Sequence, residues 1–156
     1  MKKVIALLMA ATMCVAALTG CGGSGAASPP AEATTPDSMA LILSGPANDQ
    51  GWNAVAVGGL EATAAQFNLE TTIMENVEIA DTESAYRQLA ADGYDIIIGH
   101  GYQFSEPVVT VAQQYPEVAF LLGCGVIDPI ANASQYDVQL EAGGYLMGVI
   151  AALASQ

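Results

Sequence analysis

The chain has 156 residues, of which 53% are hydrophobic, and its 16 Asp and Glu against 3 Lys and Arg give a formal net charge of −13 at pH 7. A surface this acidic repels phosphate backbones and anionic lipid headgroups, so the composition argues against nucleic-acid binding and against electrostatic docking to a membrane. Because a tight phosphate or carboxylate site usually uses Arg or Lys, the scarcity of cations also favours a neutral or cationic ligand.

The first twenty residues have the pattern of an export signal. Lys2 and Lys3 precede a hydrophobic run at 4–18, and Leu18-Thr19-Gly20-Cys21 is typical of a lipoprotein cleavage site. The run is shorter than the ~20 residues of a membrane span. We therefore expect residues 1–20 to be a signal peptide and Cys21 to carry a diacylglycerol that anchors the protein at the extracytoplasmic face of the cell membrane.

The segment that follows the proposed anchor is rich in Gly, Ser, Ala, Pro and Thr. It has too few large apolar residues to pack, so 21–38 is predicted to be a lipid-anchored flexible tether. Residues 39–156 are predicted to form one α/β lobe.

Within that lobe, short apolar runs alternate with amphipathic stretches. The pattern predicts strands at 40–43, 69–74, 95–98 and 118–122, with a fifth at 135–140, and helices at 51–67, 81–91, 106–115 and 141–154. In the first helix, Phe67 is expected to be the last residue of the buried apolar stripe on helix 51–67, and Asp81 is expected to cap the N-terminus of helix 81–91. Alternating strands and helices predict a parallel sheet covered by helices on both faces. The apolar end of the last helix should bury against further protein.

Two loops follow strand ends, which is where ligands bind in open parallel sheets. Loop 44–53 holds the only tryptophan, Trp52, which suits stacking on a planar heterocycle or a sugar face. Two structural alternatives remain for this loop: Trp52 could plug the end of the core, and Asp49 could only cap the helix. Loop 99–106 has two glycines that let backbone approach a ligand, or it is an ordinary turn in which Ser105 caps a helix.

Catalytic signatures are weak. The sequence has no nucleophile elbow and no phosphate-binding Walker loop, and its one histidine, His100, cannot build a metal cluster. Cys124 is expected to be an inert thiol, and an acid–base pair of Asp49 and Glu106 has little support. We expect a binding protein, with no enzymatic activity, no cofactor and no metal.

Three segments, 45–53, 101–106 and 141–148, together match one known family, and the most specific of their elements is 48–53. It resembles the basic-membrane-protein (BMP) family of ABC-transporter substrate-binding lipoproteins. The resemblance implies a periplasmic-binding-protein-like (type I) fold of two lobes joined by a hinge, of which this chain is the N-terminal one. It also implies capture of a purine nucleoside or nucleobase for delivery to permease subunits. The ligand-binding residues that it implies are Asn48, Asp49, Trp52, Asn53, Tyr102 and Phe104.

The chain departs from the family pattern at two points. Because of the doubled Gly143-Gly144, Glu141 aligns with the family's acidic residue only to within one position. The second lobe is missing, so the chain looks truncated. A binding protein for a sugar or another small polar solute, and a non-transporting surface or sensor lipoprotein, remain as alternative functions.

Overall fold

The computed structural model describes residues 35–155, so the predicted signal peptide, the anchor at Cys21 and most of the predicted tether lie outside the described residues. The strands are β1 (Ser38–Leu43), β2 (Glu70–Met74), β3 (Ile96–His100), β4 (Ala119–Gly123) and β5 (Ala133–Tyr136). The helices are α2 (Trp52–Phe67), α3 (Thr82–Ala91), α4 (Ser105–Ala112) and α5 (Leu140–Ala154), with 3₁₀ turns η1 (Ile79–Asp81) and η2 (Tyr102–Phe104).

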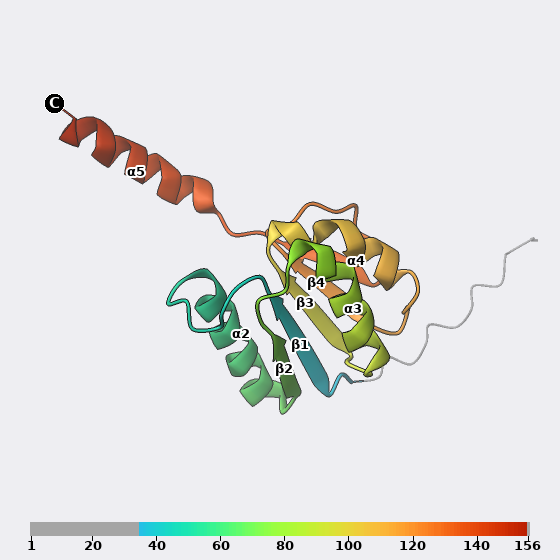
Figure 1. Ribbon diagram of the computed structural model, residues 1–156. Coiled ribbons are helices and arrows are strands. Elements are labelled where there is room, and N and C mark those ends of the chain that lie inside the picture. The colour runs from blue at the N-terminus through green and yellow to red at the C-terminus, as the bar shows by residue number, and fades with distance from the viewer. Residues whose placement is uncertain (1–34, 156) are drawn as a thin grey trace, which may run out of the picture. The chain divides into compact units, whose positions relative to one another are not determined.

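All five strands form one sheet in the order β2-β1-β3-β4-β5, and every neighbouring pair is parallel. This confirms the predicted α/β class. After β1 the chain crosses outward to β2, and it then returns past β1 to add β3 and β4 (Figure 1). The last strand, β5, lies next to β4. The carboxyl ends of β1 and β3 are therefore neighbours, and the loops that follow them meet at one edge of the sheet.

One face of the sheet is covered by α3 and α4 (Figure 1). Ala40 and Ile42 of β1, Ile97 of β3 and the side chains of both helices form a continuous buried cluster there. Gly99 is required in this layer, because a Cβ at that position would collide with the Tyr86 hydroxyl. This face is the main hydrophobic core.

The opposite face has only α2 as cover. Leu41 of β1 is 1% exposed beneath this helix, whereas Ile96 and Ile98 of β3 and Leu121 of β4, which point to the same face, are only partly buried. Helices therefore lie on both faces of the sheet, as predicted, although α2 leaves this second face open over β3 and β4. The last helix, α5, has no buried residue along its length.

Several predicted boundaries need correction. The fifth strand ends at Tyr136 instead of 140, and α4 ends at Ala112, three residues before the predicted end. Phe67 is 63% exposed, so it does not end a buried stripe on α2 as predicted. Asp81 precedes α3 as predicted but makes no side-chain capping bond, because η1 already occupies the preceding turn.

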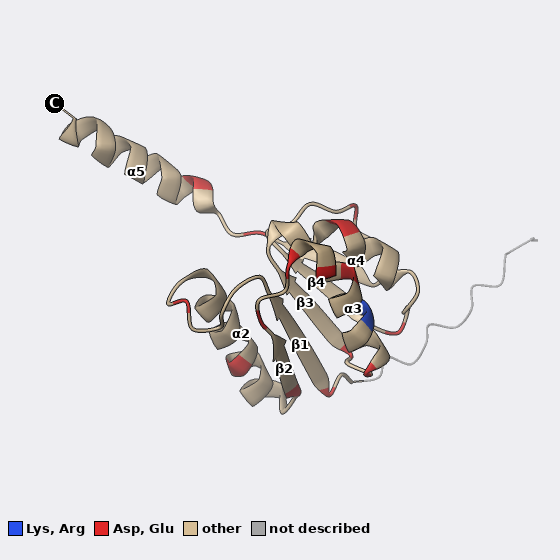
Figure 2. Cartoon of the chain, in the orientation of Figure 1, with Lys and Arg blue, Asp and Glu red and all other residues tan. Residues whose placement is uncertain are grey.

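None of the Asp, Glu, Lys and Arg side chains within residues 35–155 is buried, and Figure 2 marks where they lie along the elements. Arg87 on α3 pairs with Glu83 one turn earlier at 2.7 Å, the i,i+4 spacing that stabilises an exposed helix modestly. In α5 the only charged residue is Glu141, next to its start. Among residues 35–155, no helix is both long enough and apolar enough to cross a membrane.

Candidate ligand-binding site at the edge of the sheet

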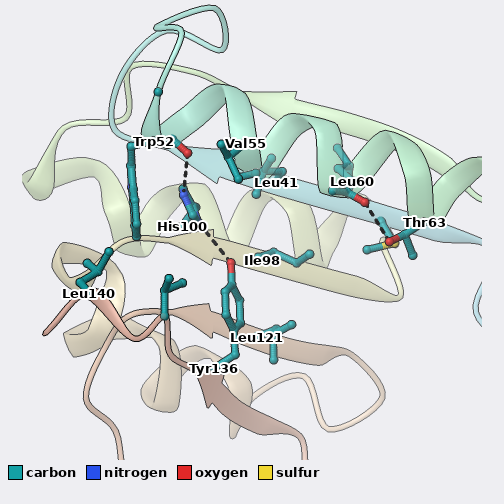
Figure 3. A pocket seen from close by; sticks show the side chains of 15 residues that line it. Leu41, Trp52, Val55, Leu60, Thr63, Ile98, His100, Leu121, Tyr136 and Leu140 are labelled. Carbon is teal, nitrogen blue, oxygen red and sulfur yellow. Dashed lines mark hydrogen bonds between the residues drawn. The ribbon is translucent and has the colours of Figure 1, made fainter. Parts of the chain in front are cut away.

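A groove of about 610 Å³ lies between α2 and the uncovered sheet face. Its floor is apolar and comes from β1, β3, β4 and the inner side of α2 (Figure 3). At the carboxyl edge of the sheet it meets Trp52, His100 and Tyr136, the aromatic group of the site. The residues that line the groove are Met39, Leu41, Gly51, Trp52, Val55, Ala56, Gly59, Leu60, Thr63, Ile98, His100, Leu121, Tyr136, Val138 and Leu140.

Trp52 and His100 stack on each other although 48 residues separate them in the sequence. Their ring centroids are 4.2 Å apart and their planes differ by 23°. Trp52 is the first residue of α2 and His100 is the last of β3, so the β1–β3 pairing brings them together. Trp52 stays 38% exposed while His100 is 5% exposed, so the imidazole supports the indole from inside.

The His100 ring is held at both nitrogens. Nε2 lies 3.0 Å from the Trp52 carbonyl oxygen, and Nδ1 lies 3.1 Å from the Tyr136 hydroxyl. Because a carbonyl only accepts, Nε2 carries the proton and donates it, and the neutral ring accepts the Tyr136 O–H at Nδ1. Burial lowers the pKa of His100 below its ordinary value, and its hydrogen bond to Trp52 and the nearby Asp49 charge oppose that effect. The neutral imidazole, which is hydrogen-bonded at both ring nitrogens, fixes the start of α2.

Asp49 caps the same helix from the loop before it. Its carboxylate accepts backbone N–H groups from Gly51, Asn53 and Ala54 at 2.9, 2.9 and 3.0 Å. These bonds, led by the one from Asn53, hold the pKa of Asp49 below its ordinary value. Asp49 therefore caps α2, which is the structural alternative that the sequence left open for this residue. The side chain is nevertheless exposed at the loop surface, where its remaining oxygen lone pairs face solvent.

The other residues that the family resemblance implied lie in different environments. Asn48 is exposed on the loop before α2, and Tyr102 is 72% exposed on η2. Asn53 is 5% exposed under the same loop, and its Oδ1 has no hydrogen-bond partner among residues 35–155. Phe104 is fully buried against Tyr86 in the core of the other face, and it does not line the groove.

Ser105 and Glu106 do not serve the roles considered for them. The Ser105 hydroxyl donates to the Tyr102 carbonyl at 2.5 Å and accepts from the Val126 N–H, so it links two loops instead of capping α4. Glu106 is exposed and does not line the groove. Within residues 35–155, no three acidic, histidine or cysteine side chains gather closely enough to hold a metal ion.

Two residues of the aromatic group were not identified as site residues from the sequence. His100 lies in the candidate loop 99–106 but was assigned no role there, and Tyr136 fell inside a predicted strand. A usable signal existed for His100, because a polar residue directly after the apolar run Ile96–Gly99 ends a parallel strand, where ligand sites form. No such signal marked Tyr136, whose approach to His100 depends on the pairing of β4 with β5.

The fold and the edge site define a lobe of a solute-binding protein, and comparison with known proteins specifies the family. The family model described as ABC transporter substrate-binding protein PnrA-like matches residues 37–156. The chain belongs to this family, as its resemblance to basic membrane proteins predicted.

Several curated relatives agree with this assignment. The chain is 32% identical over 121 residues to a purine-binding protein of Brucella abortus, covering 76% of this chain and 34% of that protein. It is 26% identical over 160 residues to the ABC transporter nucleoside-binding protein BmpA of Lactococcus lactis, covering 99% and 46%. The chain thus spans between a third and a half of the length of these relatives.

Solved structures show the same fold. A solute-binding protein of an ABC transporter system from Aeropyrum pernix superposes with a TM-score of 0.69 at 26% identity, covering 75% of this chain and 32% of that one. A second, from Conexibacter woesei, gives 0.61 at 30% identity, covering 70% and 37%. These overlaps correspond to one lobe of a larger protein, which confirms the predicted type I N-terminal lobe.

Proposed function

We propose that the protein captures a purine nucleoside or nucleobase at the carboxyl edge of the sheet and that an ABC importer takes the solute up. The observation that carries this proposal is Trp52, whose indole is backed by His100 and remains 38% exposed at the groove. A flat aromatic ring that is fixed from behind stacks on a planar heterocycle at little cost in entropy.

The chemistry of the groove supports a neutral ligand. Its lining contains no Lys, Arg, Asp or Glu, so nothing there would pair with a phosphate or a carboxylate. Asp49, Asn48 and Tyr102 lie exposed on the two loops that meet at this edge and are our candidates for hydrogen bonds to the polar edge of the base. The relatives named for purine and nucleoside binding support the same ligand class.

A sugar is the second candidate ligand. The chain is 32% identical over 73 residues to a putative ABC transporter glucose-binding protein of Haloferax volcanii, covering 46% of this chain. An indole also packs on the apolar face of a sugar, so the tryptophan alone does not decide between the two. The purine proposal requires the base to stack, and the sugar proposal does not.

Delivery of the solute requires permease subunits, and these are the proposed protein partners. The proposed lipid anchor at Cys21 would keep the lobe close to them on the extracytoplasmic side of the membrane. Radioactive palmitate labelling of the expressed chain tests this part separately. Label that is retained in Cys21→Ser would contradict the anchor.

The binding proposal is tested by isothermal titration of the chain with adenosine, adenine, guanosine and glucose. We expect saturable heat with the purines, and we expect Trp52→Ala to weaken binding by about 1–3 kcal/mol, the usual contribution of one stacked base. Phe67→Ala is the matched control, because Phe67 is an exposed aromatic on the same helix that does not line the groove. Equal affinity of Trp52→Ala and Phe67→Ala for purines would contradict stacking, and heat with glucose alone would favour the second candidate.

A further inference from the structure

The loop that carries the candidate ligand contacts crosses from β1 to α2 without regular secondary structure. It spans residues 44–51 and presents Asn48 and Asp49 to solvent at the carboxyl edge of the sheet. Gln50 in this loop has a left-handed backbone, with φ at 58°. Such a segment keeps one geometry only if its contacts offset the conformational entropy that ordering it costs. The contacts that hold the loop therefore decide where its side chains lie.

The end of the loop next to α2 is held by contacts with the start of that helix. The Asp49 carboxylate accepts backbone N–H groups from the first turn of α2, and the Trp52 carbonyl is held by His100. These contacts fix Asp49 relative to the helix. They do not fix residues 44–48, the half of the loop that lies nearer to β1 in the chain.

The other half of the loop is held by the segment that follows β2. Because β2 pairs in parallel with β1, the two strands leave the sheet side by side. The Asn76 N–H donates to the Gly45 carbonyl at 3.3 Å. The Glu75 carboxylate accepts the Ala47 N–H at 2.6 Å. Of these two contacts, the one made by Glu75 reaches further into the loop and ends one residue before Asn48.

The contact at Ala47 combines packing with a hydrogen bond. Ala47 is partly buried against the apolar cluster beneath α2, while its N–H is bound by the carboxylate. A charged acceptor makes a stronger hydrogen bond to a backbone N–H than a neutral one does. Glu75 itself is exposed and belongs to neither hydrophobic cluster, so replacing it leaves the core intact.

We propose that Glu75 is a positioning residue for the binding loop: it holds Ala47 and thereby sets where Asn48 and Asp49 lie. Glu75 does not line the groove, so it would act on affinity without touching the solute. The apparent affinity of a site falls in proportion to the fraction of time that the site spends in its binding-competent conformation. This inference rests on the proposed function, because it assumes that a solute binds at this edge.

The proposal is tested by titrating the full chain with adenosine and following the fluorescence of Trp52. We expect Glu75→Ala to raise the dissociation constant about three- to tenfold, because the loop loses one charged hydrogen bond and spends less time in the competent conformation. Glu78→Ala is the matched control, since Glu78 is an exposed acid on the same connection and makes no side-chain capping bond. We expect Glu78→Ala to bind as the wild type does. Equal dissociation constants for the two variants would overturn the proposal.

A conservative variant separates the hydrogen bond from the charge. Glu75→Gln is neutral but keeps a side-chain oxygen that can accept the Ala47 N–H. We expect its dissociation constant to stay within about twofold of the wild type, since the neutral bond keeps most of the restraint. Binding as weak as that of Glu75→Ala would assign the effect to charge and would overturn the proposal.

Hydrogen exchange of the Ala47 amide, followed by nuclear magnetic resonance without ligand, reports the contact itself. We expect exchange to be about three- to tenfold faster in Glu75→Ala than in the wild type or in Glu75→Gln, because only the first variant lacks the acceptor. Unchanged exchange would overturn the proposal. This measurement also separates the two proposals. A wild type that binds no purine refutes the proposed function, whereas the exchange rate of Ala47 still decides whether Glu75 holds the loop.

Discussion

His100 is predicted to stabilise the lobe by joining three elements, and replacing it with Ala tests this directly. The change removes the hydrogen bonds to the Trp52 carbonyl and the Tyr136 hydroxyl and the stacking contact with the indole. Each hydrogen bond contributes about 0.5–1.5 kcal/mol net, and the aromatic contact adds about 0.5–1.5 kcal/mol. We therefore expect His100→Ala to lower the free energy of unfolding by about 1.5–4.5 kcal/mol.

The assay is guanidinium unfolding followed by far-UV circular dichroism, which reports the whole lobe. Tyr136→Phe is the partial control, because it removes only the bond at Nδ1 and should lower the free energy of unfolding by about 1 kcal/mol. The emission of Trp52, the single tryptophan, should also shift to longer wavelength in His100→Ala as the indole loses its support. A loss below about 0.5 kcal/mol in His100→Ala, within the usual range of neutral surface changes, would refute this reasoning.

Three further predictions concern the sheet that carries the site. Gly99→Ala should lower the free energy of unfolding by about 1–3 kcal/mol or more, because its Cβ would strike the Tyr86 hydroxyl. Gly58 lies on α2, and a Cβ there would meet nothing within 4 Å, so Gly58→Ala should raise the free energy of unfolding by roughly 0.5–1 kcal/mol in the same denaturation experiment. The pKa of His100 in the folded protein lies below its ordinary 6.5, so its contribution to the free energy of unfolding is complete above pH 6.5 and is lost as the pH falls toward the folded pKa. The free energy of unfolding of the wild type should therefore fall in that pH range, while that of His100→Gln should not change. Asn132→Ala should cost about 1–3 kcal/mol by calorimetry, because the Asn132 amide reaches three backbone carbonyls between α4 and β4; a melting temperature equal to wild type would contradict this role.

Much of the fold was predictable because hydrophobic periodicity marks strands and helices directly. The run at 40–43 could only be a buried strand, and the helix after it was predicted to within one residue. Periodicity shows which residues share a face, but it does not show whether a helix covers that face. Ile97 and Ile98 look alike in the sequence, yet Ile97 is buried under α3 and α4 while Ile98 borders the open groove.

The site was predictable only in part, for a related reason. Trp52 was identified because it follows a strand end and is unique in the chain. His100 and Tyr136 reach it through the order of strands in the sheet, which no local pattern specifies. The direction of Phe104 could not be predicted, because a residue in a loop after a strand can point either to the edge or back into the core, and η2 turns it toward Tyr86.

The central claim, that a purine stacks on Trp52, is tested most directly by the fluorescence of this single tryptophan during titration with adenosine and with glucose. We expect saturable quenching by adenosine and no saturable change with glucose, because only the base places an aromatic ring against the indole. Emission that stays unchanged with adenosine, adenine and guanosine in a chain shown to be folded by circular dichroism would contradict the claim.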